Sequence, residues 1–339
     1  MKKILYIGNN LSKKSNYHSA MATLTELLQS EGHEVICASD ETNKFVRLLA
    51  MCYTIIKQRN SADVVLIDTF STSNFYYALM TSQLARILSL KYIPILHGGN
   101  LPHRLRHSEY MSTMIFKYAC KNVSPSLYLV SEFKKYNFET SYIPNTIPVS
   151  EYPFKLRIKL EPKLLWVRAF DKTYNPAMAI KVLALLKVTY KNASLCMVGP
   201  DKDGSLNKIK DLAKQLGVFD SVTFTGVLPK ELWHQLSEDF DIFINTTNID
   251  NMPVSVMEAM ALGLPIVSTN VGGLPYLIEN NVNGLLTPVN DEKKMVEALV
   301  TLLQDPEMSA VLCKNAREKA ERFDERAVKI KWNKLLEDV

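Results

Sequence analysis

The amino-acid sequence predicts an α/β protein made of two doubly wound domains, each a parallel sheet covered by helices. Three observations support this fold class. Short, continuously apolar runs alternate with helical stretches, as expected for parallel strands buried on both faces. The alternation stops at residues 144–163, where four prolines interrupt it, and then begins again. A chain of 339 residues also exceeds one average domain.

The first half reads as five strands with helices between them. The strands are the apolar runs KILYIG, HEVICAS, DVVLID, YIPILHG and NVSPS. Helical patterns fall at His18–Ser30, Asn74–Ser89, Glu109–Cys120 and Ser126–Lys135.

The second half repeats this architecture without repeating the sequence. Strands are predicted at KLLWVRA, SLCMVGP, SVTFTG, DIFINTT, PIVST and GLLTPV. Helices are predicted between them at Asn175–Tyr190, Ser205–Leu216, Lys230–Glu238 and Val254–Leu262. From Asp291 onward the chain reads as helical, with breaks at Asp305-Pro306 and Phe323-Asp324.

We therefore expect one domain at residues 1–150 and a second at 151–322, followed by a terminal helix at 323–339. Ligands of open α/β sheets bind beyond the carboxyl ends of the strands. Two Rossmann-like domains in tandem would therefore line a cleft with their strand ends, and we expect the two domains to face each other across it.

Composition restricts the possible partners. Residues 1–150 carry 16 Lys+Arg and 10 Asp+Glu, a charge of +6, whereas residues 151–339 carry 24 and 25, a charge of −1. The basic first half could face an anionic membrane surface or an acidic acceptor, although a solvated surface without a partner explains the charge equally well. Nucleic acid is not expected, because no recognition motif or basic-aromatic stripe accompanies the charge.

The five cysteines are scattered and never form a CxxC arrangement, which indicates thiols in a reducing compartment. The apolar run after the first lysines is too short for a signal peptide, and no run approaches about 18 apolar residues. We therefore expect a cytoplasmic protein, acting in solution or at the inner face of the membrane.

Several common chemistries are excluded by missing motifs. No GxGxxG follows a predicted strand, no GxxxxGK[ST] is present, and no GxSxG occurs. A dinucleotide-dependent dehydrogenase, a P-loop nucleotidase and an α/β-hydrolase are therefore not favoured. His103 and His107 are four residues apart but lack a third ligand, so loop or surface histidines are favoured over a metal site. No metal site is expected.

The most informative stretch is residues 245–286. Asp250 lies in the loop after a predicted strand, and Pro253 is placed as the first residue of the following helix. The helix start at Pro253, Val254 and Ser255 suits a diphosphate, because its free backbone N–H groups lie at the positive end of the helix dipole. Gly272 and Gly273 form a loop in which the backbone can approach a ligand closely.

Glu258 lies within the same helix, and its neighbours are almost all apolar. A solvated helix charge is the simplest interpretation of a single glutamate. A carboxylate in an apolar helix, however, is costly to bury without a partner. A functional role for Glu258 is therefore favoured.

The stretch DNMPVSVMEAMALGLP resembles the signature of the retaining glycosyltransferases of the GT-B fold, in particular glycosyltransferase family 4. That signature is an acidic residue, seven intervening residues, Glu-Ala, and a Gly-x-Pro turn into a strand. Weaker similarities occur at EGHEV (31–35), SPS (124–126) and IPN (143–145). The resemblance extends over the whole chain and implies the GT-B fold, although its specific motifs lie in the second half. It also implies that the terminal helix around Trp332 packs back on the N-terminal domain.

The resemblance implies roles for residues of the second domain. Glu258 matches the glutamate that accepts hydrogen bonds from the donor ribose. Asp250 matches an acidic position near the donor sugar, with a side chain one methylene shorter than the usual glutamate. Arg168 and Lys172 match the basic pair that binds the diphosphate.

Physical chemistry independently favours the diphosphate role of this basic pair. A departing nucleoside diphosphate gains negative charge, and fixed cations stabilise it where the charge develops. Arg168 and Lys172 follow the first strand of the second domain, where ligands bind. Ordinary surface cations remain the alternative interpretation.

Several glycines and one histidine complete the set of candidates. The resemblance places Gly199, and Gly226 with Val227, near the nucleotide base. Such strand-end glycines are, however, also common without a function. A histidine near the position of His97 can contact the donor sugar in the family, and a local hydrogen-bonding role is equally compatible.

The first loop departs from the family pattern, which often has a Gly-Gly pair there. Ser15 and Asn16 occupy that place, and Gly8 remains available at the end of the first strand. This difference concerns the acceptor side more than donor binding.

The resemblance implies a retaining hexosyltransferase that needs no metal or cofactor. Its donor would be a UDP-, GDP- or ADP-linked sugar, bound by the second domain, and its acceptor a glycan or a lipid-linked molecule, bound mostly by the first. Two alternatives stay open. One is a nucleotide-sugar epimerase of the same fold, and the other is a nucleotide-sugar-binding protein without transferase activity.

Overall fold

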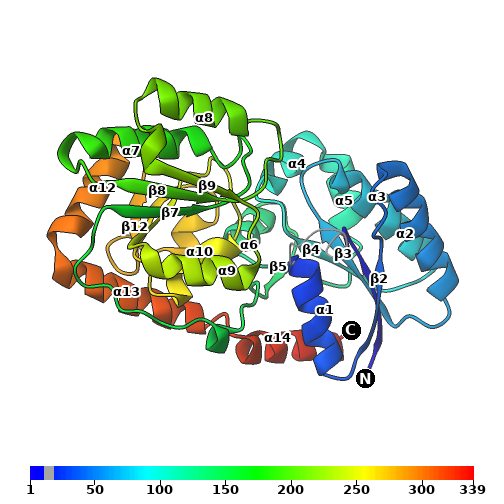
Figure 1. Cartoon of the computed structure of the whole chain (residues 1–339). Coiled ribbons are helices and arrows are strands. Elements are labelled where there is room, and N and C mark those ends of the chain that lie inside the picture. The colour runs from blue at the N-terminus through cyan, green and yellow to red at the C-terminus, as the bar shows by residue number, and fades with distance from the viewer. Residues whose placement is uncertain (11–18) are drawn as a thin grey trace. The chain divides into compact units, whose positions relative to one another are not determined.

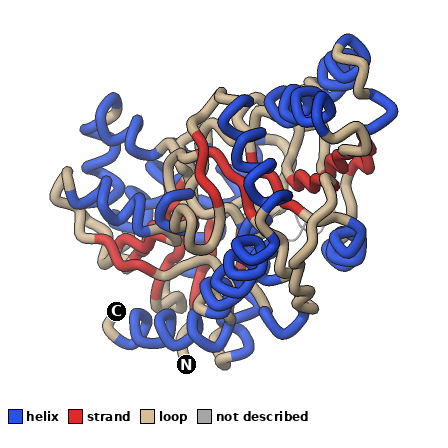
Figure 2. The backbone as a smooth tube through the Cα atoms, turned by 90° about the vertical axis from the view of Figure 1, so that its left-hand side faces the viewer, coloured by secondary structure: helices blue, strands red, loops and turns tan. Residues whose placement is uncertain are grey.

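The computed structural model describes residues 1–10 and 19–339, and the chain forms two compact units. Unit 1 contains residues 1–146 and 325–339, and unit 2 contains residues 147–324. Each unit is a six-stranded sheet in which every strand pair is parallel, enclosed between helices (Figures 1 and 2). The predicted fold class is confirmed. The units divide after residues 146 and 324, four residues before and two residues after the boundaries expected from the sequence.

Unit 1 has the strand order β2-β1-β3-β4-β5-β6. Its strands are β1 (Lys3–Ile7), β2 (Glu34–Ala38), β3 (Val64–Thr69), β4 (Tyr92–Leu96), β5 (Asn122–Ser124) and β6 (Thr140–Tyr142). Its helices are α1 (Ala20–Ser30), α2 (Lys44–Gln58), α3 (Asn74–Ile87), α4 (Leu101–His107), α5 (Glu109–Phe116), α6 (Leu127–Lys134) and α14 (Glu325–Glu337).

Unit 2 has the strand order β12-β11-β10-β7-β8-β9. Its strands are β7 (Lys163–Val167), β8 (Ser194–Val198), β9 (Val222–Gly226), β10 (Ile242–Asn245), β11 (Ile266–Thr269) and β12 (Leu285–Thr287). Its helices are α7 (Pro176–Thr189), α8 (Leu206–Gln215), α9 (Lys230–Leu236), α10 (Val254–Ala261), α11 (Leu274–Leu277), α12 (Glu292–Gln304) and α13 (Pro306–Glu321).

Side-chain caps start many of these helices. The Asn43 carboxamide accepts hydrogen bonds from two amides at the start of α2, and the Asp305 carboxylate accepts one at the start of α13. Pro306 then occupies the first turn of α13, where its missing N–H costs no hydrogen bond. The predicted breaks at Asp305-Pro306 and Phe323-Asp324 are confirmed, because they separate α12, α13 and α14.

The sequence prediction missed α2, α4, α11 and the short strand β6. In α2, apolar residues face both the core and the surface. The expected helix at His18–Ser30 begins at Ala20, and His18 lies outside the described residues. The expected helix at Glu109–Cys120 ends at Phe116.

Apolar side chains cover both faces of each sheet. In unit 1 one core gathers α2, α3, α5 and α6 against the sheet, and the other gathers α1 and α14. The terminal helix α14 contributes Trp332 to the latter core, beside Tyr6 and Leu28. No helix among residues 1–10 and 19–339 is long and apolar enough to cross a membrane.

Each sheet has one point where the strand order reverses direction. In unit 1 this point lies between β1 and β3, and in unit 2 between β7 and β10. Ligands of doubly wound sheets bind beyond the carboxyl ends of the strands at such a point. A ligand site is therefore expected at the residues that follow these four strands.

Candidate functional site

In unit 2, Arg168 and Asp250 lie at the switch point and form an ion pair. Arg168 follows β7, and Asp250 lies in the loop after β10. The Arg168 Nε also donates to the Asn245 Oδ1, at 3.4 Å, and its guanidinium lies 4.8 Å from the centre of the Tyr174 ring. Two residues that the sequence assigned separately to diphosphate and sugar are thus brought together.

The two charges of this pair are largely withdrawn from solvent. Burial raises the pKa of Asp250, and the Arg168 charge opposes that shift. Part of the positive charge of Arg168 is therefore compensated by Asp250, while the other donors of its guanidinium remain a planar fork suited to an anion.

Lys172 lies in the same loop and presents its charge to solvent. Its backbone amide donates to Asp203 Oδ2 at 2.9 Å, and its carbonyl accepts from the Asn248 side chain at 3.0 Å. The ammonium group makes no hydrogen bond or ion pair within the described part of the chain. The loop is therefore anchored while its cation remains available to an anion.

Glu258, on α10, is buried with 5% of its surface exposed and is held by two partners. Its Oε1 accepts from the Tyr152 hydroxyl at 2.9 Å and lies 3.2 Å from the Lys230 ammonium. Burial raises the pKa of Glu258, and Lys230 and Tyr152 act against that rise. The expectation that a carboxylate in this apolar helix has a partner is met.

Sequence reasoning missed both of these partners. Tyr152 lies in the proline-rich stretch interpreted only as a linker, 106 residues before Glu258, and Lys230 begins α9. The Tyr152 carbonyl in turn accepts from Arg317 at 2.9 Å, which ties the linker to α13. A buried carboxylate signals that a partner exists, but nothing local identifies which one.

The start of α10 presents unpaired polar groups. Pro253 is the N-cap with extended backbone (ψ 117°), so the first helical residue is Val254 rather than the predicted Pro253. The Pro253 carbonyl accepts from the amides of Val256 and Met257, whereas the first helical amides have no partner within the helix. The Ser255 hydroxyl is buried without a hydrogen-bond partner among the described residues.

Gly272 and Gly273 pack against the backbone around Asp250. A Cβ on Gly272 would overlap the Asp250 carbonyl oxygen, and one on Gly273 would overlap the Asn251 carbonyl oxygen. The Gly273 amide donates to the Asp250 carbonyl at 3.1 Å. The close backbone approach expected at these glycines is thus made to the chain itself, and it places the loop that carries Asp250.

Gly199 follows β8 and lies against Arg168, and Gly226 ends β9. The Gly199 amide donates to the Gly226 carbonyl at 2.8 Å, and a Cβ on Gly199 would overlap the Arg168 carbonyl oxygen. Both glycines have positive φ, 147° and 71°, which side chains rarely adopt. Val227, the next residue, is exposed. The close approach of Gly199 to the strand end at Arg168 therefore requires a residue without a side chain, whereas Gly226 is favoured only by its backbone conformation.

In unit 1, a buried carboxylate that sequence reasoning missed joins the predicted His97. Asp68, on β3, accepts from the Tyr6 hydroxyl at 2.9 Å, and its same Oδ1 lies 2.9 Å from the His97 Nε2. Burial raises the pKa of Tyr6 well above its usual value, with Asp68 adding to the rise. The carboxylate thus orients the His97 ring, which also stacks on Phe70 at 5.4 Å.

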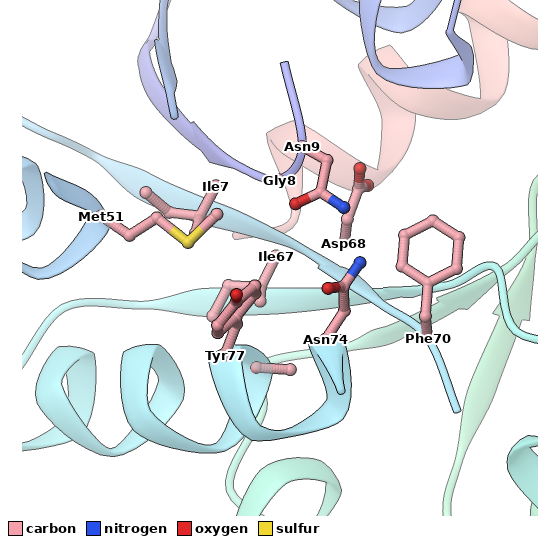
Figure 3. A pocket seen from close by; sticks show the side chains of 10 residues that line it. Ile7, Gly8, Asn9, Met51, Ile67, Asp68, Phe70, Asn74 and Tyr77 are labelled. Atoms are coloured by element: carbon pink, nitrogen blue, oxygen red, sulfur yellow. The ribbon is translucent and has the colours of Figure 1, made fainter. Parts of the chain in front are cut away.

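Gly8, at the end of β1, lies against the other oxygen of Asp68, and a Cβ there would be 2.5 Å from Oδ2. Asn9, Asp68 and Asn74 line a small cavity of about 10 Å³, enough for about one water molecule (Figure 3). Ser15 and Asn16, which stand where relatives often have two glycines, lie outside the described residues.

No group of three His, Cys, Asp or Glu side chains that could hold a metal ion occurs in the described ranges 1–10 and 19–339. His103 and His107 instead stack on each other with ring centres 4.1 Å apart.

Comparison with known proteins identifies relatives of this chain by sequence. The family model "Glycosyl transferases group 1" matches residues 149–319. A D-inositol 3-phosphate glycosyltransferase of Saccharomonospora viridis is 34% identical over 133 residues, 38% of this chain and 30% of that protein. An uncharacterized glycosyltransferase of Haemophilus influenzae is 29% identical over 213 residues, 60% of this chain and 56% of that protein. The matched segments thus span about a third to just over half of these relatives.

Solved structures resemble the whole chain. Sucrose-phosphate synthase of Thermosynechococcus elongatus has a TM-score of 0.82 at 15% identity, over 99% of this chain and 98% of that one. HepE of Anabaena, solved in complex with UDP-glucose, has a TM-score of 0.77 at 16% identity, over the full length of both chains. These likenesses establish the fold, which is GT-B.

Proposed function

The chain belongs to the group 1 glycosyltransferases, and from that premise we propose that it transfers a hexose-type sugar, with retention of anomeric configuration, from a nucleotide-diphosphate sugar to a glycan or lipid-linked acceptor. Unit 2 binds the donor, and unit 1 binds the acceptor. The reaction takes place in the cytoplasm, in solution or at the inner face of the membrane.

The observation that carries the proposal is the buried Glu258. A carboxylate is costly to bury without a partner. This one is stabilised by a hydrogen bond from Tyr152 and an ion pair with Lys230, in the helix that follows a strand of the switch point. Both contacts are made by Oε1. The other oxygen, Oε2, can accept hydrogen bonds from the ribose hydroxyls of the donor, and we assign it that role.

Cations and a helix start supply the diphosphate site. Lys172 presents an uncompensated charge, and Arg168 lies beside the start of the loop that leads to α10. The amides of Val254 and Ser255 add the positive end of the α10 dipole. These groups stabilise the negative charge that develops on the departing nucleoside diphosphate, so no metal ion is required for this step.

Asp250 and His97 are assigned to the reacting sugar. Asp250, paired with Arg168, lies close to the phosphate side, where a carboxylate can accept from a sugar hydroxyl. His97, oriented by Asp68, presents a fixed ring to a sugar hydroxyl in unit 1. The strand-end residues Gly199, Gly226 and Val227 are assigned to the nucleotide base.

Nucleotide binding is the first test. Thermal unfolding is followed with UDP, GDP, ADP and their glucose conjugates, each with and without EDTA. A ligand at about 100 times its dissociation constant adds about 2.7 kcal/mol to the free energy of unfolding. For a domain of this size, that raises the Tm by a few degrees. We expect one nucleotide class to raise the Tm of the wild type in the presence of EDTA and to leave the Tm of Glu258→Ala unchanged.

Glu292→Ala serves as the matched control, because Glu292 is a glutamate of unit 2 that pairs with Lys181 away from the switch point. No shift with any nucleotide, from a folded protein, would contradict the proposal. UDP and UDP-glucose are tried first because the HepE structures contain them.

Two alternative functions give different products. A nucleotide-sugar epimerase would return an altered sugar without an acceptor, and a binding protein would return the donor unchanged. Incubation with the donor selected above and a panel of glycan and polyprenyl-phosphate acceptors distinguishes them. Sugar found on an acceptor in the donor's anomeric configuration supports retaining transfer.

A further inference from the structure

Helix α2 of unit 1 is apolar on two opposite faces. Met51 and Ile55 are buried against the sheet. On the other side Phe45, Leu49 and Tyr53 follow one another at intervals of four residues and are 73%, 57% and 65% exposed. Such spacing places all three on one stripe of the helix, opposite the core. Most surface helices carry polar residues there, so this stripe needs an explanation.

The stripe continues onto α3, which lies beside α2 (Figure 1). The Tyr77 hydroxyl of α3 donates to the Lys44 carbonyl of α2 at 3.0 Å, which joins the two helices. Tyr76 and Met80 of α3 are exposed like the residues of α2. We call the exposed side chains of Phe45, Leu49, Tyr53, Ile56, Tyr76 and Met80 the α2–α3 face.

Charge around the α2–α3 face has one sign. Lys44 and Lys57 stand at the two ends of α2, Arg86 lies near the end of α3, and neither helix contains Asp or Glu. The acidic residues nearest to α2 in the chain, Glu41 and Asp63, lie outside both helices. Apolar and aromatic side chains bordered by cations are the composition of helices that lie in a membrane interface.

We propose that the α2–α3 face docks unit 1 on the surface of an anionic lipid bilayer. The apolar side chains enter the boundary between headgroups and acyl chains, and the lysines contact the phosphates of anionic lipids. A second copy of the chain fits this face less well, because it would bring the same cations together with no carboxylate from either helix.

This inference deepens the proposed function, which includes the inner face of the membrane, but it does not rest on the donor site. Vesicle binding and nucleotide binding use different units, so each is measured in every variant. A chain that binds vesicles without binding nucleotides, or the reverse, separates failure of one idea from failure of the other.

Vesicle co-sedimentation tests the apolar part. The wild type is expected to sediment with vesicles of phosphatidylcholine containing about one third phosphatidylglycerol, and weakly with phosphatidylcholine alone. Leu49→Glu is expected to lower the partition coefficient at least about tenfold, because a leucine no longer enters the bilayer. Ile330→Glu is the matched control, since Ile330 is 67% exposed on α14 of the same unit and the charge change is the same. It should stay within about twofold of the wild type.

Lysine substitutions test the electrostatic part. Lys44→Gln with Lys57→Gln should weaken binding to the anionic vesicles by about fivefold per lysine, with little effect on neutral vesicles. Lys208→Gln with Lys293→Gln, two exposed lysines of unit 2, is the control of equal charge. Unfolding curves confirm that all variants are folded.

Three results would overturn the proposal. The wild type could fail to bind anionic vesicles, or Ile330→Glu could lose as much binding as Leu49→Glu. Alternatively, light scattering in vesicle-free buffer could show a dimer that Leu49→Glu converts to a monomer, which would assign the face to a second copy.

Discussion

At the scale of single residues, unit 2 keeps its two acidic candidates ion-paired and largely shielded from solvent. Asp250 has Arg168, and Glu258 has Lys230 together with the Tyr152 hydroxyl. Removing one member of a buried pair leaves the other charge without compensation, which costs more than the pair itself contributes. Substitution of Arg168 therefore tests stability, and substitution of Lys230 tests the pH dependence of nucleotide binding.

Arg168→Met is expected to destabilise unit 2 by about 3 kcal/mol, because Asp250 then lacks its partner in a site largely shielded from solvent. Arg168→Met combined with Asp250→Asn should recover most of that loss in urea unfolding, since no buried charge remains. Nucleotide affinity should stay low in both variants if Arg168 contacts the diphosphate. Equal stability of the single and double variants would contradict this account.

Lys230→Met is expected to make nucleotide binding more sensitive to acid. The pKa of Glu258 is already raised by burial, and removing the Lys230 charge raises it further. Because ribose binding is assigned to the ionised carboxylate, affinity falls as pH drops through that pKa. The fall should therefore begin at a higher pH in the variant.

Calorimetric titrations of the nucleotide from about pH 8 to about pH 5 measure this shift. Titration of the ligand itself is common to all variants, and Lys230→Arg should behave like the wild type. Two other ionisable groups of α9 lie near the pair. Burial lowers the pKa of His234 to about 4, so it stays neutral over this range, and Glu231 acts on the Tyr152 pKa. An unchanged profile in Lys230→Met would show that Lys230 does not keep Glu258 ionised.

At the scale of elements, the site depends on where loops meet at strand ends. Thr246, Thr247 and Asn248, after β10, bond to the backbone of the loop after β7. The loop carrying Asp250 is then fixed from its other side by Gly272 and Gly273. The position of the acidic candidate is thus set by two neighbouring loops.

Gly273→Ala is expected to destabilise unit 2 by about 2 kcal/mol and to weaken nucleotide binding. The new Cβ would overlap the Asn251 carbonyl, so the backbone of that loop must move. Gly217→Ala is the control, because its Cβ meets nothing within 4 Å and only the positive φ of 67° is strained. Gly217→Ala should cost about 1 kcal/mol and leave nucleotide affinity unchanged. Equal affinities of the two variants would argue against a positioning role for Gly273.

At the scale of the whole molecule, the chain builds two units with separate cores and returns to the first at its end. The last helix, α14, gives Val328, Trp332, Leu335 and Leu336 to the core of unit 1. Unit 1 is therefore incomplete until the end of the chain is folded, whereas unit 2 is continuous in sequence.

Trp332→Ala is expected to destabilise unit 1 by about 3 kcal/mol through the cavity that it leaves. Ile330→Ala, exposed on the same helix, should have little effect. Limited proteolysis followed by mass spectrometry assigns the loss, because cleavage should begin within residues 1–146. Preferential cleavage within residues 147–324 would contradict the assignment of α14 to unit 1.

The sequence by itself determined the fold class, most strands, the breaks between the last helices and the position of Glu258 in an apolar helix. These features follow from local patterns, namely apolar runs, caps and proline breaks. Each such pattern spans only a few consecutive residues. Helix α2 was not predicted, and only the structure shows that one of its apolar stripes is exposed. That same stripe is the feature from which a docking surface was inferred.

Only the tertiary structure decided which groups meet. Tyr152 and Glu258 are 106 residues apart, Arg168 and Asp250 are 82 apart, and Tyr6 and Asp68 are 62 apart. No local pattern encodes such pairs, because parallel strands bring distant loops to one edge of a sheet only after the chain has folded. The sequence therefore supplies the charges, and the order of the strands supplies their partners.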